Sequence, residues 1–297
     1  MPEAGCHCFG YRADGLEIVA GPPDLETWRA HPFRSGIPLL FPWPGRIAKG
    51  KFTYGGREIQ LPLNETAHGH AIHGLTWNCA FAISAQSSDH LSMEFDSASN
   101  AQLSEIWPFP FKIRIDYLVG GGLRIRTLVT NWGPTSMPFG FGAHPYFHVP
   151  LGGQSGGREN ITLQVPSMLS HWILDENLIP TGELQPVAGR FDFRAPRPLA
   201  SETYDDAFHL DPARDATRPV ARLADPNQGK AIELYADRSF GEFVVFTPPG
   251  KPALALEPYT CASDAFNLSS RGMSAGMREL APGASFEAGF EIRVASL

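Results

Sequence analysis

The sequence predicts an all-β fold of antiparallel strands. The 30 glycines and 27 prolines interrupt the 297-residue chain at short intervals, as turn residues do. Between them lie short segments in which apolar and polar residues alternate, which is the pattern of a half-buried strand. Alternating segments separated by turns every ~8–12 residues are typical of a β-sandwich or barrel.

A hairpin is the clearest single element. Residues 112–118 and 123–129 alternate apolar with charged side chains, and three glycines at 120–122 connect them, so isoleucines should face the core and arginines the solvent. Further strands are expected at 243–246 and 286–294, one short helical turn at 101–106, and a flexible loop at 152–157. No low-complexity linker divides the chain, so we expect a single domain over residues 1–297.

Two strands end in a polar residue immediately before a proline. His144 closes the run at 139–144, and Glu257 closes the run at 253–257. Proline restricts its predecessor to extended backbone, so both side chains should stand on stiff supports. A histidine and a carboxylate held in this way suffice for general acid–base chemistry, with ordinary pKa values near ~6.5 and ~4.3.

Composition restricts the partners. A formal charge of −7 argues against nucleic acid or an anionic membrane surface. No segment reaches the ~18 consecutive apolar residues of a membrane span, and the first residues lack a basic-then-apolar signal. Four cysteines are too few for a disulfide scaffold, so we expect a reducing cytoplasm. Cys6-His7-Cys8 alone lacks the ligands of a zinc site.

A series of short motifs runs through the chain in a fixed order. Arg46 opens R-I-x-x-G-x-F, His73-Gly74 follows, and A-H-P-Y-F occupies 143–147, before Y-D-D-A-F at 204–208 and L-E-P at 256–258. This series resembles the aldose 1-epimerase (galactose mutarotase-like) family. The resemblance implies an antiparallel β-supersandwich and an enzyme that interconverts the α and β anomers of a free sugar. It implies a small-molecule sugar substrate, a monomer or homodimer, and neither metal nor redox cofactor.

The resemblance also implies roles for five residues. Glu257 would be the base that takes the anomeric hydroxyl proton, and His144 the acid that protonates the ring oxygen. Arg46 and His73 would hydrogen-bond the sugar, and Asp205 would orient its hydroxyl groups. The neighbouring residue Asp206 competes for that last role because adjacent strand residues face opposite ways. Aromatic candidates for the walls that pack on the sugar are Trp43, Trp77, Tyr146 and Phe208.

Other functions remain open at this point. A carbohydrate-binding protein without activity could share the fold, and a glycoside hydrolase could use Glu257 with Asp205 or Asp206. His68, His70 and His73 with Glu65 could instead hold a metal ion.

The sugar itself is not determined by these motifs. One branch of the family acts on hexose 6-phosphates, but Arg34, Lys49, Lys51 and Arg57 should be scattered over different faces, which favours neutral aldoses. The chain also departs from the galactose-type pattern at Gly45, Gly74, Pro145, His148 and Tyr259, so galactose specificity does not carry over.

Overall fold

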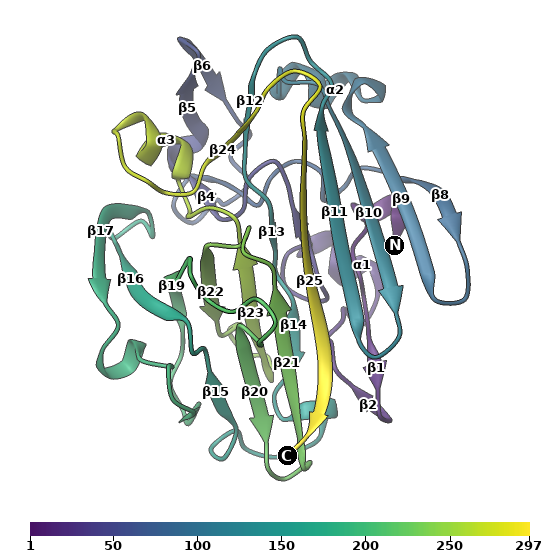
Figure 1. Ribbon diagram of the computed structural model, residues 1–297, viewed down its shortest axis with the longest axis vertical. Helices are drawn as coiled ribbons and strands as arrows, with labels where there is room; N and C mark the ends of the chain where they lie inside the picture. Colours follow the sequence, from purple (N-terminus) through teal and green to yellow (C-terminus); the bar gives the residue numbers. More distant parts are fainter.

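Two large antiparallel sheets make up most of the fold in the computed structural model, which describes residues 1–297 (Figure 1). The nine-stranded sheet has the order β18 (Arg197–Pro198), β15 (Thr162–Gln164), β20 (Ala221–Asp225), β21 (Lys230–Ala236), β25 (Ser285–Ser296), β11 (Leu123–Asn131), β10 (Phe111–Val119), β9 (His90–Asp96) and β8 (Ala82–Gln86). The eight-stranded sheet has the order β17 (Pro180–Pro186), β16 (Met168–Leu174), β19 (Asp205–Leu210), β22 (Glu242–Phe246), β23 (Ala253–Tyr259), β13 (Gly142–Ala143) and β3 (Leu39–Leu40), with β14 (Tyr146–His148) also paired to β23.

Smaller elements surround these sheets. Four two-stranded pairs join β1 (Arg12–Ala13) to β2 (Leu16–Glu17), β4 (Arg46–Ile47) to β7 (Ala71–Ile72), β5 (Lys51–Tyr54) to β6 (Arg57–Gln60), and β12 (Met137–Phe139) to β24 (Arg278–Leu280). The α-helices are α1 (Leu25–Ala30), α2 (Ala101–Ile106) and α3 (Ala265–Ser270), and single 3₁₀ turns lie at Pro2–Ala4, Ala48–Gly50, Ser97–Ser99, Leu151–Gly153 and Gly189–Phe191. None of the helices is long and apolar enough to cross a membrane.

The expected hairpin and helical turn are both present. β10 and β11 pair in register, with Ile115 opposite Thr127, and the isoleucines are buried while Lys112 and Arg114 are exposed. The side chain of Asn100 caps α2 by accepting a hydrogen bond from the Leu103 amide at 3.0 Å. The all-β antiparallel class is therefore confirmed.

The main hydrophobic core lies between the sheets. It is a cluster of 59 buried residues that includes Ile113 and Ile125 of the nine-stranded sheet and Phe208, Leu254 and Leu256 of the eight-stranded sheet. Each fully buried side chain of this size contributes about 1.5–3 kcal/mol. Because the inner face of the eight-stranded sheet is occupied in this way, its outer face is free to form a site.

Candidate active site

The strand β23 carries apolar residues on one face and the candidate base on the other. Leu254 and Leu256 point into the core, whereas Ala255, Glu257 and Tyr259 alternate with them and face outward. All seven residues of β23 are buried, because other elements cover the outer face as well. The run A-L-A-L-E-P-Y therefore places a carboxylate on the covered outer face of an interior strand.

His144 lies beside Glu257, on the segment that pairs with the other edge of β23. Gly142 of β13 is opposite Tyr259 and Tyr146 of β14 is opposite Ala255, so His144 falls in the short gap between β13 and β14. Its Nε2 is 3.2 Å from Oε1 of Glu257. The two proline-marked segments, more than a hundred residues apart in sequence, are thus brought together. The expectation that Glu257 ends its strand is wrong, because β23 continues through Pro258 to Tyr259 and stays paired with β22 there.

A cavity of about 640 Å³ opens above this pair. That volume lies within the range of small-molecule sites. Its floor is the outer face of β19, β22 and β23, which contributes Asp205, Ala207, Val244, Phe246 and Glu257. Loops from the first 80 residues and from residues 174–178 form the walls. All five predicted site residues, His144, Glu257, Arg46, His73 and Asp205, line this one cavity.

Arg46 and His73 are held by the small β4–β7 pair. Arg46 lies opposite Ile72, the His73 amide donates to the Gly45 carbonyl at 2.9 Å, and the Gly45 amide donates to Nδ1 of His73 at 3.3 Å. Gly45 has a φ of 64°, and a Cβ there would lie 2.1 Å from Oγ of Ser263. This close approach explains why the chain has glycine, not asparagine, before Arg46. Nε of Arg46 is buried without a hydrogen-bond partner, and the residue lines the cavity.

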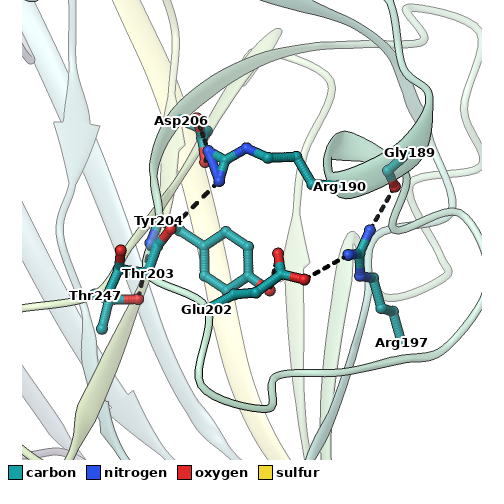
Figure 2. A network of polar contacts seen from close by, with 8 residues as sticks. All are labelled: Gly189, Arg190, Arg197, Glu202, Thr203, Tyr204, Asp206 and Thr247. Carbon is teal, nitrogen blue, oxygen red and sulfur yellow. Dashed lines mark hydrogen bonds and ion pairs between the residues drawn. The ribbon is translucent and has the colours of Figure 1, made fainter.

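Asp205 faces the cavity and Asp206 does not. Asp206 accepts two hydrogen bonds from Nη2 of Arg190, at 2.7 and 2.6 Å, and Figure 2 shows this ion pair beside Tyr204. Asp205 is exposed to the cavity and has no ion-pair partner. The cavity walls partly desolvate it, and this burial raises the pKa of its carboxyl group. The geometry therefore separates the two adjacent carboxylates that the sequence left in competition.

Burial shifts the pKa values of both His144 and Glu257. Desolvation lowers the pKa of His144 to about 3. Desolvation also raises the pKa of Glu257 well above its usual value, against an opposing hydrogen bond from Tyr259. The expectation of ordinary pKa values near ~6.5 and ~4.3 is therefore wrong for both residues. Both shifts favour the neutral form of each side chain, so a proton shared by the pair rests on the carboxyl group when the cavity contains no sugar.

The hydrogen bonds around His144 show which nitrogen can move a proton. The hydroxyl of Tyr146 donates to the Phe33 carbonyl at 2.7 Å and lies 3.4 Å from Nε2 of His144. Nδ1 of His144 is buried without a partner. Nε2 is therefore the atom through which His144 exchanges a proton with Glu257 or with a molecule in the cavity.

Two of the predicted aromatic walls are wrong. Trp43 is buried in the core against Trp107, with ring centroids 5.9 Å apart, and Phe208 is fully buried on the core side of β19. Trp77 and Tyr146 do line the cavity, as expected. Phe33, Phe246 and Tyr259, which the sequence did not mark as walls, complete the aromatic lining.

The expected scattering of basic residues is only partly correct. Arg34 lines the cavity, together with Arg29, which the sequence did not single out, whereas Lys49, Lys51 and Arg57 do not. The only signal for this segment was a second histidine–proline pair, His31-Pro32, just before Phe33.

The side chains of His68 and His70 form hydrogen bonds within the protein. His70 accepts from the Lys49 amide at 3.1 Å through Nδ1 and contacts the Asn177 carbonyl at 3.1 Å through Nε2. His68 pairs with Glu65 at 3.0 Å. Because both nitrogens of His70 have backbone partners, these residues do not form the metal-ligand set that the sequence left open.

Comparison with protein-family models gives a match along almost the whole chain. The family model described as aldose 1-epimerase matches residues 1–293. This chain belongs to the aldose 1-epimerase family. Its relatives' names support a sugar epimerase.

The chain is similar to several members at low identity. YihR of Escherichia coli is 27% identical over 290 residues, covering 90% of this chain and 89% of YihR. Maltose epimerase of Levilactobacillus brevis is 27% identical over 244 residues, covering 77% and 69% of the two chains. Galactose mutarotase of Homo sapiens is 29% identical over 250 residues; the match covers 76% of this chain but only 66% of that enzyme.

A solved structure confirms the predicted supersandwich. A galactose mutarotase-like protein from Clostridium acetobutylicum superposes with a TM-score of 0.91, covering 100% of this chain and 91% of that one, at 22% sequence identity. The antiparallel β-supersandwich of the galactose mutarotase-like type is therefore the fold of this family member.

Proposed function

We propose that this chain is a mutarotase that interconverts the α and β anomers of free aldoses. The observation that carries the proposal is the pairing of His144 Nε2 with Glu257 Oε1, 3.2 Å apart, on the floor of the cavity. An acid and a base in contact with the same bound molecule are what hemiacetal opening requires.

The reaction needs two proton transfers. Glu257 in its ionised form accepts the proton of the anomeric hydroxyl, while protonated His144 gives the proton on Nε2 to the ring oxygen, and the C1–O5 bond breaks. Rotation about C1–C2 presents the other face of the aldehyde, and the same two transfers run backwards as the ring closes. The pair holds one proton before and after, so no proton is gained or lost.

The remaining site residues bind the sugar. Arg46 and His73 would donate to the ring oxygen and to hydroxyl groups, which stabilises the charge that develops as the ring opens. Asp205 would accept hydrogen bonds from hydroxyl groups. The lining holds three arginines, at 29, 34 and 46, and three carboxyl groups, at 65, 205 and 257, so it carries no marked excess of positive charge. This balance supports neutral aldoses or oligosaccharide reducing ends as the substrates.

We also propose a cellular compartment and a domain organisation for this activity. All four cysteines are free thiols, which supports a reducing compartment, the cytoplasm. The main core cluster includes residues from both sheets, which supports one domain over residues 1–297.

Polarimetry of freshly dissolved aldoses tests the function. Glu257→Gln keeps the shape of the side chain but removes the base, so we expect the rate to fall ~10²–10⁴-fold with little change in sugar affinity. His144→Asn should cause a comparable loss. Glu242→Gln is the matched control, because Glu242 is a buried carboxylate of the adjacent strand whose partners, Trp172 and His209, do not line the cavity.

Other outcomes would favour the other functions. New reducing ends released from a glycoside would indicate a hydrolase, and sugar binding without any acceleration of mutarotation would indicate a binding protein. A Glu257→Gln variant that retains a tenth of the rate would remove Glu257 from the base role.

A further inference from the structure

The two proton-transfer residues are each followed by proline and tyrosine. The chain reads His144-Pro145-Tyr146 where β13 gives way to β14, and Glu257-Pro258-Tyr259 on the neighbouring strand β23. Residues two apart on a strand share a face, so each tyrosine lies beside the residue it follows. The ring of Tyr146 stacks on that of His144 with centroids 4.6 Å apart, and the hydroxyl of Tyr259 donates to Oε2 of Glu257.

The two tyrosines differ in where their hydroxyl protons go. That of Tyr146 is used by the Phe33 carbonyl, at 2.7 Å, so Tyr146 can only accept from His144. The hydroxyl of Tyr259 has Glu257 as its hydrogen-bond partner, and the side chain is only 2% exposed. Burial, together with the nearby Glu257 carboxylate, raises the pKa of Tyr259 well above its usual value, so the hydroxyl keeps its proton and stays a donor.

This contact gives the two oxygens of the Glu257 carboxylate different partners. Oε2 receives the tyrosine hydrogen bond, and Oε1 faces His144. We propose that Tyr259 is a positioning residue of the mutarotase reaction, which holds Oε2 so that Oε1 is the oxygen that accepts the anomeric proton. The inference rests on the proposed function, since it assigns Glu257 as the base.

The same hydrogen bond stabilises the reactive form of the base. A donor to a carboxylate favours its ionised state, which the reaction requires and which burial opposes. The titratable and charged groups that face Glu257 from the surrounding elements are Tyr259, His144, Tyr146, Asp205 and Arg46. Of these, only Tyr259 forms a hydrogen bond with the carboxylate.

Tyr259→Phe is the direct test. It keeps the ring that lines the cavity and removes only the hydroxyl, so we expect kcat to fall about 10- to 100-fold, the range for one hydrogen bond to a charged group, with KM little changed. The pKa at which the pair loses its last proton should rise, because the carboxylate has lost a donor. The alkaline limb of kcat should therefore move to higher pH.

The matched control is Tyr117→Phe. Tyr117 is also buried, its hydroxyl donates to the Cys6 carbonyl at 2.6 Å, and neither residue lines the cavity. This variant loses a comparable hydrogen bond and should keep both kcat and the alkaline limb. A purely structural role for Tyr259 would give the same result as this control and would overturn the inference.

A double substitution separates the inference from the proposed function. With Glu257→Gln already present, Tyr259→Phe should change the residual rate by less than about twofold, because the tyrosine acts through the carboxylate. An equal loss in both backgrounds would overturn the inference. If Glu257→Gln alone leaves the rate intact, the proposed function fails instead.

A fluorinated tyrosine covers the case in which Tyr259→Phe does not fold. Introduced at position 259 by nonsense suppression, 3-fluorotyrosine is nearly isosteric and has a more acidic hydroxyl, so it donates more strongly. The alkaline limb should then move to lower pH, opposite to the shift expected for phenylalanine. A limb that stays in place would overturn the inference.

Discussion

Asp205 and Asp206 offer a paired perturbation in which one residue should affect activity and the other stability. They are adjacent on β19, carry the same charge and differ in the face they occupy. Asp205 lines the cavity, whereas Asp206 pairs with Arg190. Replacing each by asparagine in turn changes the same atoms in both variants, so a general effect of lost charge cannot explain a difference between them.

The structure sets the expected magnitudes. Asp205→Asn would lose a charged acceptor for sugar hydroxyls, worth about 1.5–3 kcal/mol, so kcat/KM should fall about 10- to 100-fold. Asp206→Asn would lose an ion pair whose arginine side chain is 42% exposed. Solvent screens such a pair, so the free energy of unfolding should fall by no more than about 1 kcal/mol while kcat/KM stays constant.

The stability of the Asp205 variant provides a check on sign. Burial raises the pKa of Asp205 in the folded protein above its unfolded value. Ionisation therefore opposes folding at pH values above the folded pKa, and the penalty disappears as the pH falls below the unfolded pKa. At pH 7 Asp205→Asn should be at least as stable as the parent protein.

Two assays give the answer. Polarimetry on glucose and galactose yields kcat/KM, and urea unfolding followed by circular dichroism yields the free energy of unfolding. Equal losses of activity in the two variants, or a larger loss in Asp206→Asn, would refute the assignment of Asp205 to the sugar.

Further predictions concern pH, packing and substrate choice. Activity needs the single proton of the His144–Glu257 pair. The acid limb of kcat should therefore lie near the pKa of about 3 of His144, and the alkaline limb at the raised pKa of Glu257. Limbs near ~4.3 and ~6.5, in protein shown to be folded at each pH, would contradict these protonation states. Phe208→Ala should cost about 3–5 kcal/mol of unfolding free energy without raising KM, whereas Trp77→Ala should raise KM with little loss of stability; the reverse pattern would return Phe208 to the sugar site. Rates for glucose should exceed those for glucose 6-phosphate in kcat/KM, since the lining balances arginines with carboxyl groups, and a clear preference for the phosphate would implicate the arginines at 29 and 34.

Local rules of backbone geometry predicted the centre of the site. Two-residue periodicity and the effect of proline predicted that His144 and Glu257 stand on extended backbone at strand ends. His144 does follow directly on β13, but β23 continues beyond Glu257 to Tyr259, so the proline does not end that strand. The same periodicity could have prevented one error. Asp205 and Phe208 are an odd number of residues apart on one strand, so they cannot both face the cavity, and Phe208 is in the core.

Other features of the site depend on contacts that no local pattern contains. The pKa shifts of His144 and Glu257 come from burial by elements distant in sequence. Arg34 reaches the cavity because the segment around it is anchored to Tyr146, whose hydroxyl donates to the Phe33 carbonyl. Such tertiary contacts become visible only when the chain is folded.

The reacting pair and the rim of the cavity, which faces the substrate, differ in local stability and in tolerance to substitution. Glu257 is fixed on β23, which is hydrogen-bonded on both sides, and the amide of His144 donates to the Pro38 carbonyl at 3.0 Å. Both residues should therefore open to solvent only when the whole protein unfolds. Much of the rim comes from connecting segments near residues 29–34, 64–67 and 174–178, which tolerate substitution more readily. Heating should therefore abolish activity in a single step with the fold, while drift in the rim sequences could change which sugar is accepted and leave the chemistry intact.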